Sequence, residues 1–165
     1  MSNTVNSHAQ RMTLLWFTVL SAPLMIGIAI SLLVWFGNFK APAELLPADT
    51  LRMVAMGAMG LMLVIARPLR NLVLSPSAIA GRPLQSHTVS EDMDQQAAAK
   101  TQASMFMLLG ALDFVSVIII ALSLMQADAE LALLNGIFTL VLAVVAKPDF
   151  AMLITDTAKQ LRQTT

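Results

Sequence analysis

The chain has no cysteine and no tyrosine, and only 12% of its residues are charged. The lack of cysteine excludes disulfide bonds, thiolate metal sites and cysteine nucleophiles. Ten basic and ten acidic residues cancel, so no net charge favours binding to nucleic acid. Phosphate-binding loops, zinc-ligand spacings and nucleophile motifs are also missing from the sequence. We therefore expect a protein that is not an enzyme and that uses no cofactor or metal.

Apolar residues make up 57% of the chain, and its mean hydropathy is +0.74. This predicts an all-α integral membrane protein, because uncharged runs of such length fit transmembrane helices. Four runs are expected to span the bilayer: residues 12–39, 53–66, 101–127 and 131–146. The two tryptophans, Trp16 and Trp35, lie near opposite ends of the first run, where aromatic side chains anchor helices at the membrane surface.

The four runs pair into two tandem helical hairpins. A capping box at Thr88-Val89-Ser90-Glu91 predicts that the third helix starts near Val89 and extends beyond the membrane. The pattern after Pro148 predicts an amphipathic C-terminal helix. The expected division is an N-terminal tail (residues 1–11), a first hairpin (12–76), a linker (77–90), a second hairpin (91–148) and an amphipathic tail (149–165).

Lysine and arginine are distributed unequally between the two sides of the predicted helices. Eight lie in the N-terminal tail, the stretch from Arg67 to Lys100 and the segment from Lys147 onward, whereas only Lys40 and Arg52 lie in the opposite loops. The positive-inside rule then places both termini and the linker in the cytoplasm. We expect a location in the bacterial inner membrane, with the lipid bilayer as the first partner.

The two predicted hairpins resemble each other. An offset of 80 residues aligns residues 63–68 with residues 143–148, so that a basic residue followed by proline ends each hairpin. An offset of 89 residues aligns parts of the first and third runs and sets Leu24 opposite Asp113. We interpret this as an internal repeat of the parallel type, in which only the second copy carries the acidic residue.

Asp113 lies near the middle of the third run, close to the expected centre of the bilayer. A charge there costs about 2.5–3.5 kcal/mol, so such residues usually mark a site. Gly110 and Ser116 share its helix face, while Ser21 and Asn135 offer polar groups on the first and fourth runs. Two interpretations remain open. Asp113 is either a protonated residue that hydrogen-bonds Ser21, Asn135 or a free carbonyl, or a group that binds and releases a proton or sodium ion.

Three further residues are candidates for helix packing. Gly57 and Gly60 in the second run indicate close contact with another helix. Pro23 in the first run cannot donate a hydrogen bond to the carbonyl of Val19, which is left free.

The middle of the chain resembles the hairpin of the rotary ATP synthase proteolipid, subunit c. The resemblance rests on four short motifs: Gly57-Ala58-Met59-Gly60, Arg67-Pro68, Lys100-Thr101-Gln102 and Gly110-Ala111-Leu112-Asp113. It implies that Asp113 is an ion-binding carboxylate in the membrane. The whole chain also looks like small four-span bacterial membrane proteins.

We expect a non-enzymatic subunit of a membrane complex, or a homo-oligomer, with Asp113 as a buried protonatable group. Other membrane subunits or further copies of the chain would then be its protein partners. Two alternatives stay open: a proteolipid-like carrier of protons or sodium ions, and an assembly factor that recruits a soluble partner.

The topology can be tested with reporter fusions after Gln163 and near Ser86. The eight-to-two distribution of basic residues predicts a cytoplasmic signal from both positions. A periplasmic signal from either fusion would overturn the predicted orientation.

Overall fold

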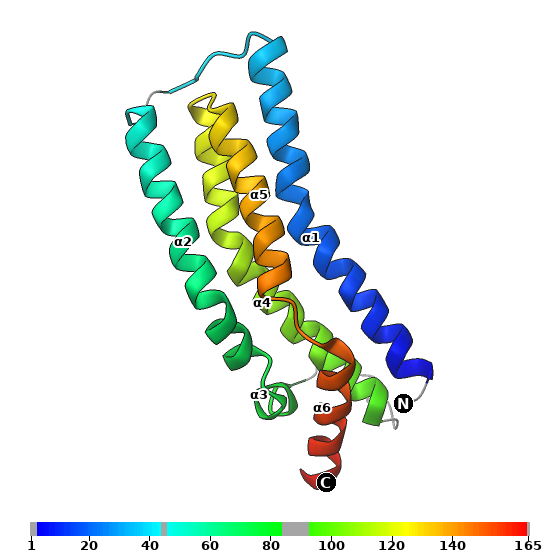
Figure 1. The fold of residues 1–165 in the computed structure, drawn as a ribbon. Coiled ribbons are helices and arrows are strands. Elements are labelled where there is room, and N and C mark those ends of the chain that lie inside the picture. Colours follow the sequence, from blue (N-terminus) through cyan, green and yellow to red (C-terminus); the bar gives the residue numbers. More distant parts are fainter. Residues whose placement is uncertain (1–2, 44–45, 84–92, 165) are drawn as a thin grey trace.

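The structure is a computed structural model that describes residues 3–43, 46–83 and 93–164. Every regular element in these ranges is a helix, and together the helices form an elongated bundle (Figure 1). Both termini lie at the same end of this bundle, which we call the terminal end. The helices are α1 (Asn3–Phe36), α2 (Ala48–Val73), α3 (Pro76–Ala80), α4 (Met93–Met125), α5 (Ala129–Val145) and α6 (Phe150–Thr164).

Three of these helices, α1, α2 and α4, are long and apolar enough to cross a membrane. A fourth candidate span is formed by α5 and α6 together, which are bent by 50° relative to each other. α5 alone has 17 residues, or about 25 Å of helix, and is short for a span. The all-helical class is thus confirmed for the described residues, and three or four candidate spans are compatible with a membrane protein.

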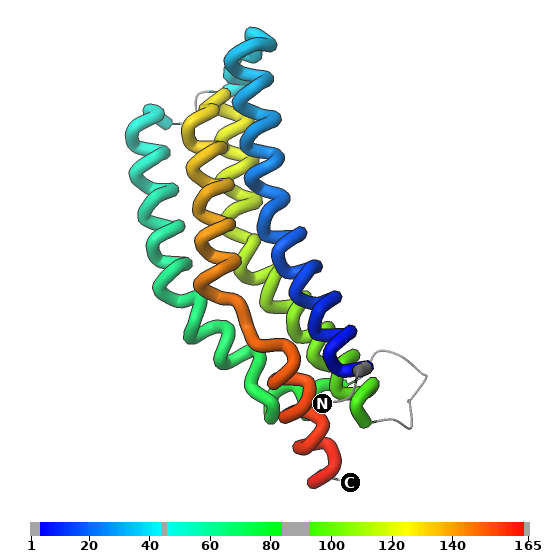
Figure 2. The backbone as a smooth tube through the Cα atoms, turned by 45° about the vertical axis from the view of Figure 1, so that its right-hand side comes forward, coloured from blue at the N-terminus to red at the C-terminus, as the bar shows by residue number. Residues whose placement is uncertain are grey.

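The helices do not pack as two tandem hairpins. α1 and α2 make no contact with each other along the described residues, because α4 and α5 lie between them (Figures 1 and 2). α1 packs most extensively on α5, while α2 packs on α4 and α5. The predicted first hairpin is therefore wrong as a packed unit, whereas α4 and α5 are neighbours in both sequence and space.

Two glycines explain why α1 pairs with α5. A Cβ atom on Gly136 would lie 2.5 Å from the Cα of Leu24, and one on Gly27 would lie 2.5 Å from the carbonyl oxygen of Ala132. The two backbones approach so closely that only glycine fits at these positions. α1 meanwhile runs unbroken through Pro23, which is buried.

Gly57 and Gly60 behave differently from this pair. A Cβ atom on either would meet nothing within 4 Å, so the close contact predicted for them is not made inside the described chain. Both glycines lie on an exposed side of α2.

Several helix ends differ from the sequence-based boundaries. α1 starts at Asn3 and stops at Phe36, shortly before Asn38, which has a positive φ of 50°. α2 continues through Arg67 and Pro68 to Val73, so the first basic-proline motif does not end the helix. α4 is a single long element, as predicted from the third run, but the capping box at residues 88–91 lies outside the described residues.

The C-terminal segment forms α6, and its apolar side is covered by this chain. Phe150, Ile154 and Ala158 are buried, and α6 packs on α4, α1 and α3. An ion pair of 3.1 Å between Arg162 and Asp94 ties α6 to the first turn of α4. This packing leaves little of the apolar side of α6 for a soluble partner.

The glycine contact between α1 and α5 can be tested with matched alanine variants. Gly136→Ala should lower the free energy of unfolding by about 1–3 kcal/mol, because the new methyl group would push against the backbone of α1. Gly57→Ala should raise it by about 0.5–1 kcal/mol, since alanine favours helix and meets no neighbour there. Thermal unfolding in detergent measures both. Equal effects of the two variants would contradict the proposed role of Gly136.

Candidate functional site

The turn between α4 and α5 lies at the end of the bundle opposite the termini. The amide of Asp128 donates to the carbonyl of Ser123 (2.8 Å), and that of Ala127 donates to the carbonyl of Leu124 (3.3 Å). Ala127 has a positive φ of 51°, so the turn is a left-handed helix cap with alanine where glycine is usual. The side chain of Asp128 then caps α5 by accepting a hydrogen bond from the amide of Leu131 (3.0 Å).

Asp128 is also held by an arginine from α2. Arg52 Nε lies 2.7 Å from Asp128 Oδ2, and Arg52 Nη2 lies 2.9 Å from Oδ1, which is a two-pronged ion pair. Arg52 Nη1 lies 2.6 Å from Glu130 Oε2. We call these three residues the ion-pair cluster. The Asp128 side chain is only 4% exposed, whereas Arg52 is 34% exposed and Glu130 is 71% exposed.

The electrostatics of Asp128 combine two opposing effects. Burial raises the pKa of its carboxyl group, but the hydrogen bonds from Arg52 and from the amide of Leu131, with the attraction of the guanidinium, lower it. The second group of effects wins, so the pKa of Asp128 lies below its ordinary value. The carboxylate is therefore ionised at neutral pH and joins α2 to the start of α5.

A second polar contact lies deeper in the bundle, between α4 and α5. Asn135 Nδ2 donates to the hydroxyl of Ser116 (2.9 Å) and to its backbone carbonyl (3.3 Å). Both side chains are fully buried. Asn135 therefore lies at the same depth in the bundle as Ser116, which is one helical turn from Asp113. The sequence alone left the depth of Asn135 open.

Asp113 does not take part in that contact. Its Oδ1 atom is buried and has no hydrogen-bond partner among the described residues. Leu112 and Ser116 beside it are buried, whereas Phe114 and Val117 are exposed, so Asp113 lies at the border of the buried side of α4.

The other predicted partners of Asp113 lie elsewhere. Ser21 donates its hydroxyl to the carbonyl of Thr18 on its own helix (3.1 Å). Asp113 thus forms neither the hydrogen bond to Ser21 nor the one to Asn135 that the structural interpretation predicted. A Cβ atom on Gly110 would meet nothing within 4 Å. One side of α4 is exposed except for the half-buried Asp113. We call this side the Asp113 face, and it consists of Phe106, Gly110, Asp113 and Val117.

The junction of α5 and α6 is a third polar region, at the terminal end. Pro148 has no amide hydrogen to continue the helix, and carbonyls at the end of α5 need other donors. Trp16 Nε1 donates to the carbonyl of Ala143 (2.9 Å), and Arg70 donates to that of Lys147 (3.0 Å). Trp16 is fully buried and meets Phe150 edge-on, so the prediction that it anchors the helix at the membrane surface is wrong.

Sequence reasoning missed the ion-pair cluster and the role of Trp16. Arg52 and Asp128 are 76 residues apart, and the sequence pattern places Arg52 only in a loop between two apolar runs. One usable signal was present, because Asp128 directly precedes an apolar helix, where aspartate is a favoured cap. Its ion-pair partner depends on how the helices are arranged.

Comparison with known proteins yields no match: no family model, no curated protein and no solved structure is significantly similar to this chain.

Substitutions of Asp128 should separate its two roles. Asp128→Ala removes both the helix cap and the partner of Arg52, and should lower the free energy of unfolding by about 2–4 kcal/mol. Asp128→Asn should cost less, because asparagine also caps helices. As a control, Glu130→Gln should change stability by less than about 0.5 kcal/mol, since Glu130 is largely exposed. Thermal unfolding in detergent gives all three values.

The lowered pKa of Asp128 also predicts a pH dependence. The ionised form stabilises the fold fully above the ordinary carboxyl pKa of about 4, and this contribution is lost as the pH falls through the lower folded value. The wild-type protein should therefore lose more stability than Asp128→Asn as the pH falls below about 4. Parallel losses in the two proteins would show that Asp128 is not the group responsible.

Proposed function

We propose that this chain is a multi-pass protein of the inner membrane that acts as a non-enzymatic subunit of a membrane complex or of a homo-oligomer. In this proposal the Asp113 face is the contact surface, and both termini are cytoplasmic. The location is supported by the apolar helices and the orientation by the basic residues at the terminal end.

The observation that carries the proposal is the unpaired oxygen of Asp113. Hydrocarbon offers no hydrogen bonds, so an unpaired buried polar atom is costly in a membrane. The described residues supply no partner, yet Asp113 lies at the border of an exposed side of α4. A helix from another subunit that carries a hydroxyl, amide or carboxyl group would satisfy it.

Gly110 supports the same interpretation. It lies one turn before Asp113, with open space where a side chain would stand. Small residues in transmembrane helices allow backbones to approach closely, which brings polar side chains within hydrogen-bond distance. Gly57 and Gly60 leave a similar open strip on α2, which a second contact in an assembly would cover.

A second candidate function is the proteolipid-like ion carrier. The same unpaired oxygen favours it, because a carboxyl group without a protein partner is available to exchange a proton or sodium ion. The resemblance of the motif Gly110-Ala111-Leu112-Asp113 to subunit c supports this candidate. The third candidate, an assembly factor, is weakened by the packing of α6 on its own chain.

The mass of the protein extracted in mild detergent from its native membranes tests the proposal. Wild-type protein and Asp113→Asn should both run as an assembly, because the amide retains hydrogen-bonding capacity. Asp113→Leu should dissociate at about fivefold to thirtyfold higher protein concentration, which corresponds to the loss of one hydrogen bond in a membrane. Its fold should survive, since Asp113 makes no hydrogen bond within the described chain.

A monomeric wild-type protein, or an Asp113→Leu variant that assembles normally, would contradict the proposal.

Reaction with a hydrophobic carbodiimide distinguishes the membrane subunit from the ion carrier. Labelling of Asp113 in a pH-dependent manner, with loss of ion transport in Asp113→Asn, supports the carrier. Full function of Asp113→Asn without labelling excludes it.

A further inference from the structure

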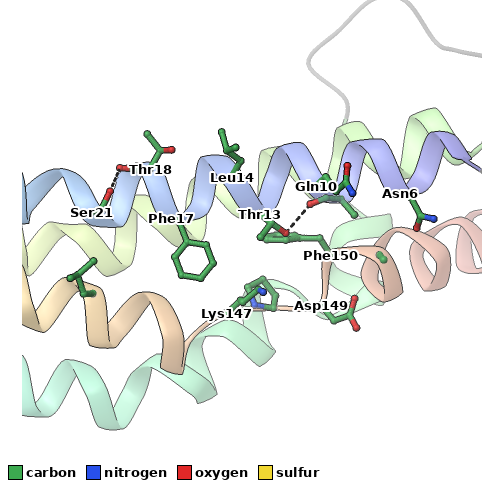
Figure 3. A pocket seen from close by; sticks show the side chains of 14 residues that line it. Asn6, Gln10, Thr13, Leu14, Phe17, Thr18, Ser21, Lys147, Asp149 and Phe150 are labelled. Atoms are coloured by element: carbon green, nitrogen blue, oxygen red, sulfur yellow. Dashed lines mark hydrogen bonds between the residues drawn. The ribbon is translucent and has the colours of Figure 1, made fainter.

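A groove with a volume of about 1050 Å³ runs along α1 beside the junction of α5 and α6 (Figure 3). Near the terminal end it is lined by polar side chains of α1, namely Asn6, Gln10 and Thr13. Farther along the bundle Phe17 and Leu140 give it an apolar lining. Thr18 and Ser21 also line this part, so the groove offers polar groups beside apolar surface along its length.

Two residues of opposite charge lie on either side of Pro148 in the wall of this groove. Lys147 Nζ lies 5.5 Å from the centre of the Phe17 ring, which directs the ammonium group toward the apolar part (Figure 3). Asp149 accepts a hydrogen bond from the amide of Met152 (3.1 Å) through Oδ1 only. Among the described residues that line the groove, these two alone carry charge.

We propose that the groove binds one phospholipid with a zwitterionic headgroup that contains a primary ammonium, as in phosphatidylethanolamine. Lys147 would contact the phosphate and Asp149 the ammonium, while an acyl chain would follow Phe17 and Leu140. A purely anionic headgroup would bring its charge beside Asp149 without compensation. The pair therefore favours a headgroup that carries both signs. This inference depends on the membrane location proposed above but not on assembly through Asp113.

Native mass spectrometry of the delipidated full-length protein in non-ionic detergent tests the inference. Phosphatidylethanolamine and phosphatidylglycerol are titrated separately, and the bound fraction is measured. The wild-type protein should retain phosphatidylethanolamine at lower concentration. Lys147→Gln and Asp149→Asn should each weaken this binding by about tenfold, the loss of one charge-assisted contact. Asparagine still caps a helix, so α6 should remain folded in Asp149→Asn.

Matched controls come from the opposite end of the bundle. Lys40→Gln and Asp49→Asn remove the same charges at exposed positions far from the groove and should leave lipid binding unchanged. The inference is overturned if phosphatidylglycerol binds as well as phosphatidylethanolamine, or if Asp149→Asn leaves the binding of phosphatidylethanolamine unchanged. It is also overturned if both groove variants match the controls. Assembly and lipid binding are measured separately. If Asp113→Leu loses assembly but binds lipid normally, the result bears on the proposed function and leaves the lipid inference unchanged.

Discussion

The backbone contact between α1 and α5 is the constraint on which the rest of the arrangement depends. Gly27 and Gly136 let the two helices approach more closely than any side chain would allow. This approach brings Trp16 to the carbonyl of Ala143 and the hydroxyl of Ser31 to the carbonyl of Ala129 (3.2 Å). Because α1 occupies that side of α5, α2 has to pack on the other side of the bundle, away from its neighbour in sequence.

Charged residues hold helix ends together where apolar packing is sparse. α2 has few buried residues, and the pair of Arg52 with Asp128 fixes its first turns against the start of α5. At the terminal end, Arg70 donates to the carbonyl of Lys147, and Lys100 donates to the carbonyl of Ala80 (2.6 Å). Basic side chains near helix ends are favoured there because the last carbonyls lack partners and carry partial negative charge. The residues that predict the topology therefore also hold the helix ends.

The sequence predicts the long helices well but not their pairing. Uncharged runs locate α1, α2, α4 and α5 because hydrocarbon excludes charge over a fixed thickness. Helix pairing depends instead on which glycines face a neighbour. Gly27 and Gly136 do so and Gly57 and Gly60 do not, although nothing in the local sequence distinguishes the two pairs. For the site, the sequence identifies Asp113 as unusual, but its orientation relative to Ser116 and Asn135 follows only from the packed bundle.

Asn135 and Asp113, two polar residues near the middle of the bundle, lie in different surroundings. Asn135 lies between two helices, fully buried, and reaches a hydroxyl and a carbonyl of Ser116. This is the arrangement expected of a residue that fixes the register of helices within one chain. Asp113 differs because it makes no hydrogen bond to a neighbouring helix among the described residues and lies at the border of an exposed face, although Oδ1 is buried and unpaired in both residues. Asp113 therefore keeps a buried oxygen beside an exposed side of α4 whose cost in hydrocarbon no described residue offsets.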